Sequence, residues 1–354
     1  MATNYLVLED GTVLEGEAFG FEKVNFGEVV FNTAMGGYQE CLTDPTNCGQ
    51  ILVSTYPLIG DYGITDDAYM SNNVWISGLV VKEYCKDPSP MYNGRKLDDF
   101  LKEHQIPAIA GIDTRELTIR IRKNGTLRGA IVFDKSEIDS VMTELKKVSD
   151  ENLVAKVSCE SAYSIDNGKD LTVGVIDCGL KNDIKDSLSA RYNLKVFPYD
   201  TPAQVIMDAG VNGVVIANGP GNPAHPAIID TVVKTVKDLS TQTAIMGLCF
   251  GSQVVALALG GKTYKLKYGH RGTSQPVRCG NRIYITTQNH GYAVDDASLE
   301  GTGLIADQIN INDKSVEGTR HKDLPIITCQ YTPGESSDTA FVYEDFTKMM
   351  EARK

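Results

Sequence analysis

Residues 244–260 read AIMGLCFGSQVVALALG, in which two apolar runs flank a Gly-x-Cys-x-Gly segment centred on Cys249. The first run is short and continuous, as expected for a strand buried on both faces of a sheet. The spacing around Cys249 is typical of a nucleophile elbow, where a reactive side chain occupies a sharp turn from strand to helix. Amides at a helix N-terminus lower the pKa of such a thiol and can bind an oxyanion. We therefore predict that Cys249 is a nucleophile; the alternative is a buried structural cysteine near a turn.

Similar short apolar runs recur along the second half of the chain, with helical stretches between several of them. The runs lie at 171–176, 194–197, 213–217, 283–286 and 325–329, and the helical stretches include 182–192 and 228–239. Buried strands that alternate with helices favour a doubly wound, mostly parallel sheet covered on both faces. Ligands bind beyond the carboxyl ends of the strands in such sheets, so the chemistry should lie just after these runs.

Two more segments follow predicted strands and are candidates for ligand contact. Residues 218–223 read NGPGNP, which is typical of a tight loop but would also bring backbone amides to a ligand. Residues 288–292 read QNHGY, in which His290 is either a structural histidine or a base. The other histidines are expected on the surface or in loops: His104, His225, His270 and His321.

The first part of the chain is strand-rich. Asp10-Gly11 between two apolar runs predicts a two-residue hairpin turn in which both residues have positive φ. Further strands are expected at 28–31 and 74–81, and helices at 97–104, 113–122 and 136–148. A polar, irregular stretch follows the last of these helices. We therefore predict an N-terminal α/β domain at 1–150, a linker at 151–170 and a second domain at 171–354.

Composition excludes several classes of protein. The 354 residues include 34 Lys and Arg against 46 Asp and Glu, a formal net charge of −12. This balance argues against non-specific nucleic-acid binding and against attraction to an anionic membrane surface. No apolar run approaches the ~20 residues of a membrane-spanning helix, and the start of the sequence shows no signal-peptide pattern. The eight cysteines include no Cys-x-x-Cys pair, so we expect a cytoplasmic protein without a metal site.

Three segments, 244–253, 218–223 and 288–292, together resemble the class I glutamine amidotransferase domain. The N-terminal half narrows the resemblance to the small subunit of carbamoyl phosphate synthetase. It does so through FGEVVFNTAMGGYQE at 26–40, LTDPT at 42–46, TYPLIG at 55–60 and IDTR at 112–115. The resemblance extends from Leu6 to about Phe346, and it combines two unrelated domain signatures in the family's order.

The resemblance implies that this chain hydrolyses glutamine and passes ammonia inside a complex to a large subunit. That subunit would use ATP, bicarbonate and Mg²⁺ to make carbamoyl phosphate, a precursor of pyrimidines and arginine, so this chain itself would hold no cofactor. A channel is needed because free ammonia becomes mostly ammonium near neutral pH, and ammonium is not a nucleophile. The resemblance assigns Cys249 as the nucleophile that attacks the glutamine amide. It assigns contacts with glutamine to Thr46, which would reach across from the N-terminal domain, and to Gly219, Gly221, Phe250, Gln253, Asn289, Gly291 and Tyr292.

The last site segment departs from the family pattern Q-x-H-P-E, whose histidine is the general base and acid and whose glutamate orients it. Residues 330–334 read QYTPG, so Thr332 stands at the histidine position and Gly334 at the glutamate position. Glu335 is one residue further on, and Ser252 occupies a position usually filled by histidine. His290 is the remaining candidate for a replacement base.

The missing acid–base group has a large chemical consequence. An unassisted thiol with a pKa of ~8.5 is only a few per cent thiolate near neutral pH, and a positioned acid–base group contributes ~10²–10⁴ in rate. We therefore expect weak or absent glutamine hydrolysis. Two functions stay open: a working glutaminase subunit, and a non-hydrolytic subunit that scaffolds or regulates a large subunit using free ammonia. A third, a different class I amidotransferase or a peptidase relative, is opposed by the N-terminal segments.

Overall fold

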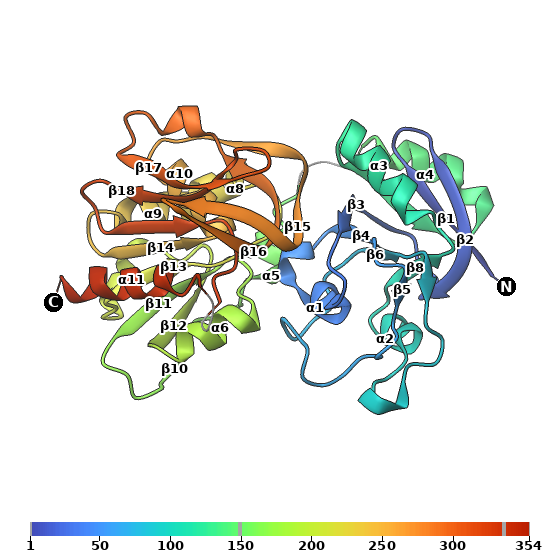
Figure 1. Cartoon of the computed structure of the whole chain (residues 1–354), viewed down its shortest axis with the longest axis horizontal. Coiled ribbons are helices and arrows are strands. Elements are labelled where there is room, and N and C mark those ends of the chain that lie inside the picture. Colours follow the sequence, from blue (N-terminus) through green and yellow to red (C-terminus); the bar gives the residue numbers. More distant parts are fainter. Residues whose placement is uncertain (1, 148–150, 335–337, 354) are drawn as a thin grey trace. The chain divides into compact units, whose positions relative to one another are not determined.

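The structure is a computed structural model that describes residues 2–147, 151–334 and 338–353. The chain divides into two compact units, Met1–Ser149 and Asp150–Lys354. Figure 1 labels the helices and strands of both units. Within the described residues, every helix is too short or too polar to cross a lipid bilayer.

The first unit is built around a closed β-barrel with the strand order β1-β2-β8-β6-β4-β3-β9. Its strands are β1 (Thr3–Leu8), β2 (Val13–Gly20), β3 (Asn25–Asn32), β4 (Gln50–Ser54), β6 (Gly78–Val80), β8 (Pro107–Ala110) and β9 (Leu127–Val132). The remaining elements are α1 (Tyr38–Thr43), η1 (Pro45–Asn47), β5 (Leu58–Ile59), β7 (Glu83–Tyr84), η2 (Pro90–Tyr92), α2 (Leu97–Glu103), α3 (Thr114–Asn124), η3 (Lys135–Glu137) and α4 (Ile138–Leu145). Neighbours among β3, β4, β6 and β8 are parallel, and the other neighbouring pairs are antiparallel.

Two of the clusters formed by buried apolar residues join the barrel strands to helices. One joins Leu52 and Leu79 to Leu42 of α1 and Phe100 of α2. The other joins strand residues of β1 and β9 to α4. The two clusters fix these helices against the barrel by burial of apolar surface.

The β1–β2 hairpin differs from the two-residue turn that we predicted. The N–H of Leu8 donates to the carbonyl of Thr12 at 2.8 Å, so the turn contains three residues. Gly11 has a φ of 91°, whereas Asp10 accepts the N–H of Thr12 through its side chain. A type I turn closed by a left-handed glycine needs positive φ at one residue rather than two.

Two other elements of the first unit are shorter than predicted. The strand expected at 74–81 is confined to β6, because the residues before it form a loop. The helix expected at 136–148 consists of η3 followed by α4, and Val148 lies outside the described residues.

The described residues of the second unit form a ten-stranded sheet with the order β10-β12-β11-β13-β14-β19-β18-β16-β15-β17. The strands are β10 (Tyr163–Ile165), β11 (Thr172–Asp177), β12 (Asn193–Pro198), β13 (Gly213–Ile216), β14 (Ala244–Leu248), β15 (Thr263–Cys279), β16 (Arg282–Val294), β17 (Leu304–Asn310), β18 (Val316–His321) and β19 (Ile326–Cys329). From β12 to β19 the neighbours are parallel, and the rest of the sheet is antiparallel.

We predicted a mostly parallel sheet, and the antiparallel part is larger than that prediction allowed. It arises because β15 and β16 form a long hairpin that turns at Gly280, whose φ is 56°. β15 is largely polar and partly exposed along its length. A pattern of buried apolar runs therefore does not reveal this strand.

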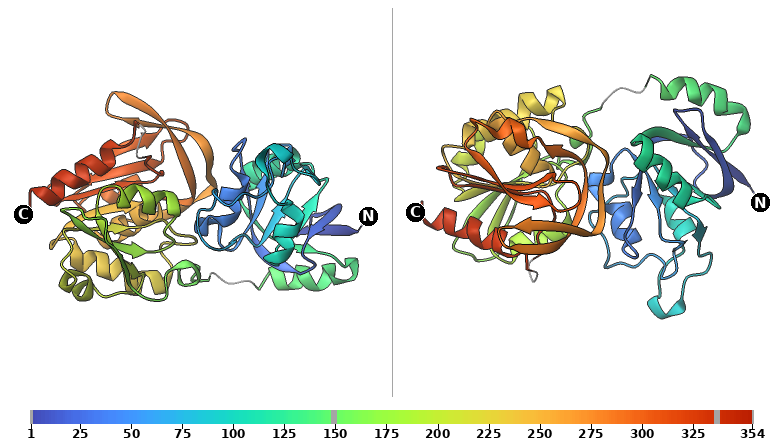
Figure 2. Two further views of the ribbon diagram at one scale, coloured as in Figure 1. Left: turned by 90° about the horizontal axis from the view of Figure 1, so that it is seen from below. Right: turned by 45° about the horizontal axis from the view of Figure 1, so that its top comes forward.

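Helices cover both faces of the parallel part of the sheet (Figure 2). α6 (Asn182–Ser189) and α11 (Phe341–Glu351) pack on one face, and α7 (Ala203–Asp208), α9 (Lys234–Leu239) and α10 (Phe250–Ala258) pack on the other. The short elements are α5 (Val154–Val157), α8 (Pro226–Ile228), η4 (Ile229–Val233) and η5 (Asp296–Leu299). The predicted doubly wound arrangement is confirmed, and the carboxyl ends of β11, β13, β14 and β19 meet at one edge of the sheet.

The stretch 151–170, which we predicted as a linker, lies within the second unit. It contains α5 and β10, and β10 pairs with β12 at the edge of the sheet. Tyr163 and Ser164 of β10 are exposed, which explains why this edge strand has a polar, irregular sequence. The predicted boundary at 150 falls on residues outside the described part of the chain.

Candidate active site

Cys249 lies between the last residue of β14 and the first residue of α10, where the Gly-x-Cys-x-Gly spacing placed it. Its backbone has a φ of 53° and a ψ of −105°, a conformation that costs a non-glycine residue about 1–3 kcal/mol. A Cβ atom at Gly251 would collide with the carbonyl group of Ile216, and one at Gly247 would lie 2.7 Å from the carbonyl oxygen of Gly251. Both glycines are therefore required for α10 to start this close to the sheet.

Cys249 is 3% exposed, and its thiol contacts two segments that are remote in sequence. Sγ lies 3.7 Å from the carbonyl oxygen of Asn289, and Nε2 of Gln330 donates to Sγ at 3.5 Å. The N–H of Cys249 donates to the carbonyl of Cys329 at 2.8 Å, which joins the turn to the end of β19. The structure thus brings the predicted nucleophile to the 288–292 segment and to the last strand.

Gln253 on α10 connects the same two segments. Its Nε2 donates to the carbonyl of Tyr292 at 2.7 Å and to Oε1 of Gln330 at 3.0 Å. Gln330 was used only as a register marker in the sequence, so its contact with the thiol was not predicted. Gln330 lies two residues before the position of the family's histidine, and this spacing could have identified it as a site residue.

The loop that follows β13 also reaches the elbow. A Cβ atom at Gly219 would lie 2.7 Å from the carbonyl oxygen of Cys178 and 3.1 Å from the ring of Phe250, and Gly221 has a φ of 81°. The Phe250 side chain is 2% exposed and belongs to the core beneath α10. Phe250 can therefore contact a ligand only through its backbone, as can the glycines of this loop.

Two positions of the last site segment carry no acid–base side chain. Thr332 follows β19, and its N–H donates to the carbonyl of Thr287 at 3.0 Å. Its Oγ1 accepts a hydrogen bond from Nζ of Lys181 at 3.2 Å. The N–H of Gly334 donates to Oγ1 of Thr339 at 3.2 Å. Glu335, the next carboxylate along the chain, lies outside the described residues.

His290 is not placed to act as a base on Cys249. Its Nδ1 lies 2.8 Å from the carbonyl oxygen of Tyr292, and its Nε2 lies 3.0 Å from Oε1 of Gln288. Burial, together with the nearby His270, holds the pKa of His290 well below its usual value. Because both ring nitrogens face the oxygens of Tyr292 and Gln288, the geometry argues against the substitution of the triad histidine by His290.

We expected His270 on the surface or in a loop, and this expectation is wrong. His270 is 6% exposed on β15, with Nδ1 2.9 Å from Oε1 of Gln288 and Nε2 2.8 Å from Oδ2 of Asp313. Burial alone would lower the pKa of His270, but hydrogen bonds to Asp313 and Glu317 outweigh it and raise the value to about 9. The histidine was missed because its partners come from three separate strand or turn segments.

His270, His290 and Glu317 place three possible metal-ligand atoms within 4.8 Å of one another. Each of these side chains already has protein partners, since Glu317 accepts hydrogen bonds from Gln288 at 2.9 Å and from Asn310 at 3.0 Å. The arrangement is a buried hydrogen-bond network that holds β15 and β16 together beneath the 288–292 segment. On the same segment, a Cβ atom at Gly291 would lie 3.1 Å from Nη2 of Arg271.

The first unit holds Thr46, which the family resemblance links to glutamine. Thr46 is 5% exposed in η1, and its Oγ1 donates to Oδ1 of Asp44 at 2.6 Å. A contact between Thr46 and glutamine stays a prediction.

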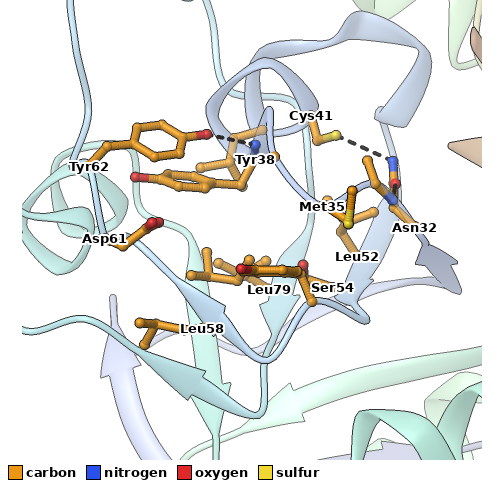
Figure 3. A pocket seen from close by; sticks show the side chains of 15 residues that line it. Asn32, Met35, Tyr38, Cys41, Leu52, Ser54, Leu58, Asp61, Tyr62 and Leu79 are labelled. Carbon is orange, nitrogen blue, oxygen red and sulfur yellow. Dashed lines mark hydrogen bonds between the residues drawn. The ribbon is translucent and has the colours of Figure 1, made fainter. Parts of the chain in front are cut away.

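The 26–40 segment, which contributed to the family resemblance, borders a pocket in the first unit (Figure 3). Tyr38 and Tyr62 stack there with ring centroids 4.3 Å apart, and the N–H of Gly37 donates to the hydroxyl of Tyr62 at 3.1 Å. The cavity measures about 60 Å³. Ligand sites usually measure about 300–1,000 Å³, so this cavity is too small for a substrate of ordinary size.

Comparisons with known proteins match both units. The family "Carbamoyl-phosphate synthase small chain, CPSase domain" matches residues 6–131, and the family "Glutamine amidotransferase class-I" matches residues 174–348. A carbamoyl phosphate synthase small chain from Archaeoglobus fulgidus is 44% identical over 354 residues and covers 98% of each chain. The chain belongs to the carbamoyl phosphate synthase small chain family.

Bacterial members of the carbamoyl phosphate synthase small chain family are equally similar. The protein of that name from Fusobacterium nucleatum is 44% identical and covers 99% of each chain, and the one from Staphylococcus saprophyticus is 42% identical over 99% of this chain and 96% of its own. The solved structure of a putative GMP synthase component from Thermoplasma acidophilum covers 52% of this chain and 95% of its own at 20% identity and a TM-score of 0.43. The full-length matches confirm the family resemblance found in the sequence.

Proposed function

We propose that this chain is the small chain of a carbamoyl phosphate synthase and that Cys249 attacks the side-chain amide of glutamine. The observation that carries the proposal is the strained position of Cys249 at the start of α10, with Gln330 and Asn289 in contact with its sulfur. Attack by the thiolate would form a tetrahedral oxyanion. Protonation of the amide nitrogen by a water molecule would allow the C–N bond to break, so that ammonia leaves and a thioester remains; a second water would then release glutamate and the thiol. Membership of the small chain family supports this assignment.

Backbone groups around Cys249 would stabilise the intermediate. The first turn of α10 and the glycines Gly219 and Gly221 follow the carboxyl ends of β14 and β13, and we propose that their backbone N–H groups bind the oxyanion. Such donors stabilise an oxyanion strongly because they are fixed before the charge develops. Gln253, by contrast, uses its side-chain amide to join Tyr292 to Gln330, so its proposed role is to hold the site together.

Hydrolysis by this chain should be slow. Thr332 and Gly334 occupy the positions of the family's histidine and glutamate, and neither side chain can take up and return a proton near neutral pH. His290 is engaged with Tyr292 and Gln288. The same observations favour a second candidate function, a non-hydrolytic small chain that supports or regulates a large chain using free ammonia.

The partners and cofactors of the proposed function lie outside this chain. We propose a large chain that uses ATP, bicarbonate and Mg²⁺, with glutamine as the substrate of the small chain. Under this proposal the complex works in the cytoplasm and its product serves pyrimidine and arginine synthesis. Enclosed transfer of ammonia between the chains would prevent its conversion to ammonium in bulk water.

A comparison of nitrogen sources tests the proposal in the complex of this chain with its large chain. Glutamate release and carbamoyl phosphate formation are measured with glutamine and, separately, with an ammonium salt. Slow but saturable synthesis from glutamine that disappears in Cys249→Ser, with ammonium-dependent synthesis intact, is the expected result. Synthesis from ammonium alone, with no glutamate released, would establish the non-hydrolytic function. Failure to form a complex with the large chain would overturn both the glutaminase function and the non-hydrolytic function.

A further inference from the structure

A second cavity of the first unit lies at the carboxyl ends of its parallel strands. It measures about 860 Å³. Its lining residues at 33, 55, 57, 82–83 and 111–115 follow the ends of β3, β4, β6 and β8, which are parallel neighbours (Figure 1), and the rest belong to α3. The carboxyl ends of parallel strands are a common position for binding sites. The cavity is therefore a candidate binding site in a unit to which only Thr46 has so far been assigned a role.

One wall of this cavity is a stripe of α3 that combines positive charge with an apolar side chain. Arg115, Ile119 and Arg122 are spaced four and three residues apart and all line the cavity, so they lie on one face of the helix. Ile119 is 56% exposed. Arginine and exposed apolar side chains together are typical of the surfaces by which proteins bind one another. We call the cavity with this wall the α3 groove.

Positive charge exceeds negative charge in the α3 groove. Lys82, Arg115 and Arg122 line it together with two carboxylates, Glu83 and Asp113. The carboxylate of Asp113 already caps α3 through a hydrogen bond of 2.9 Å to a backbone N–H. The side chains of Lys82 and Arg115 form neither an ion pair nor a hydrogen bond with the residues that the structure describes. Two cations are thus available to carboxylates of a partner, although the chain as a whole has a net charge of −12.

A nearly buried hydroxyl in the α3 groove also lacks a protein partner. Thr114 is 3% exposed and lines the groove, and its carbonyl accepts a hydrogen bond from Oγ1 of Thr118 at 2.7 Å. The hydroxyl of Thr114 itself forms no hydrogen bond within the described parts of the chain. Buried polar groups normally have a partner, and an occupant of the groove can supply one here.

The exposure of the walls favours a protein segment over a small molecule as the occupant. Lys82, Arg115, Ile119 and Arg122 are all exposed. Sites for small molecules bury about 70–90% of the ligand surface, which walls as exposed as these do not achieve. A segment of another protein covers such walls with its own surface, and carboxylate side chains on it would match the two available cations.

The sequence of the walls indicates which protein this is. Three of the stretches that carry the family resemblance, 26–40, 55–60 and 112–115, contribute residues to the α3 groove. Loop residues that are characteristic of a family and exposed usually serve binding rather than packing. Under the proposed function, the partner that all members of the family share is the large chain.

We propose that the α3 groove receives an acidic segment of the large chain. Lys82 and Arg115 would pair with carboxylates of that segment, and Ile119 would make apolar contact with it. The inference rests on the proposed function, because it presupposes that this chain assembles with a large chain.

The affinity of the full-length chain for the purified large chain tests the proposal. Arg115→Glu and Lys82→Glu should each raise the Kd by about tenfold or more, because repulsion replaces attraction, and the effect should shrink as the salt concentration rises. Both residues are exposed and have no side-chain partner, so both variants should fold as the wild type does. Lys123→Glu makes the same change of charge on α3 outside the groove and should alter the Kd by less than about twofold.

Photocrosslinking identifies the occupant directly. Ile119 is replaced by a photoreactive phenylalanine derivative, and the crosslinked peptides are identified by mass spectrometry. The expected product joins position 119 to a peptide of the large chain that is rich in Asp and Glu, and exchange of those acidic residues for Lys should restore the binding of Arg115→Glu. The same derivative at Met91 of η2, which is 84% exposed and outside the groove, should not label that peptide.

Two results would overturn the inference. One is an unchanged Kd in both Arg115→Glu and Lys82→Glu, and the other is a crosslink from position 119 to a second copy of this chain instead of the large chain. If either is found while the complex still forms and uses glutamine, the proposed function stands and the role of the α3 groove is wrong. If the complex forms through the groove but releases no glutamate, the groove has the inferred role and the glutaminase function fails. If the wild type does not bind the large chain, both fail.

Discussion

Gln330 donates its side-chain amide to the sulfur of Cys249 at 3.5 Å, although 81 residues separate them in the chain. Oε1 of Gln330 accepts from Gln253 at 3.0 Å, so one side chain joins the last strand both to the thiol and to α10. The parallel pairing of β14 with β19 brings these positions together. The contact makes Gln330 part of the site even though the histidine two residues later is missing.

Gln330→Leu should slow the reaction of Cys249 with a glutamine-derived affinity label by about tenfold, because a thiolate loses a hydrogen bond of about 1.5 kcal/mol. The label rate is measured by mass spectrometry of the peptide that contains Cys249. Gln204→Leu, at an exposed position of α7, is the matched control, since Gln204 bonds Asp208 on its own helix. Equal label rates in Gln330→Leu and the control would show that the Gln330 contact is incidental.

Restoration of the family residues should increase glutamine hydrolysis. Thr332→His together with Gly334→Glu returns an acid–base group and its orienting carboxylate to the positions set by Gln330 and Pro333. We expect glutamate release to rise by ~10²–10⁴, measured in the complex with the large chain. Gly334→Glu alone supplies no base and serves as the control. A double variant that folds and binds the large chain but hydrolyses no faster would contradict our assignment of these two positions.

Gly251→Ala should destabilise the second unit. The added Cβ would meet the carbonyl group of Ile216, which belongs to the buried strand β13 and cannot move away easily. Overpacked sites of this kind cost about 1–3 kcal/mol, which is visible as a lower midpoint of urea unfolding. Gly36→Ala is the control, because a Cβ atom at Gly36 meets no atom within 4 Å. Equal unfolding midpoints for the two variants would be incompatible with the tight turn described here.

The His270–Asp313 pair should make stability depend on pH. The pKa of His270 is raised from 6.5 to about 9, so its stabilising effect is complete below about pH 6.5 and is lost as the pH rises through 9. Burial would raise the pKa of Asp313, but hydrogen bonds from His270 and Ser315 outweigh it and lower the value, so the effect of Asp313 is present above its usual pKa of 3.8 and is lost at lower pH. Stabilisation by the pair is therefore greatest in mildly acidic solution.

Urea unfolding of wild type and His270→Gln measures this dependence. The difference in unfolding free energy between the two proteins should shrink as the pH is raised from about 6 to above 9. His104→Gln, at the partly exposed end of α2, is the control and should show no comparable trend. A difference that is constant over this interval would mean that His270 is neutral in the folded protein.

The parts of the site that could be predicted from sequence are local. The Gly-x-Cys-x-Gly segment contains its own strand, turn and helix start, so Cys249 could be placed before any partner was known. Gln330 and Lys181 were not predicted because their contacts depend on the neighbours of β14 in the sheet. These contacts arise from strand order, which single segments do not encode.

The same distinction holds for the fold. Buried parallel strands were predicted because a strand covered on both faces is apolar along its length. β15 and β10 were not, because each leaves polar or exposed side chains in solvent. His270 was missed for a different reason. Its carboxylate and amide partners lie on β16, on β18 and in the turn before β18, so no local sequence pattern indicates that it is buried.

The positive φ of Cys249 has an evolutionary consequence. The strain of about 1–3 kcal/mol would vanish if glycine replaced the cysteine, and a single lineage that had stopped using the sulfur would gain stability from that replacement. Random substitution would then remove the thiol early, before the glycines on either side. Under our proposal that Cys249 is the nucleophile, retention of the thiol at this strained backbone position would reflect selection on the sulfur atom itself.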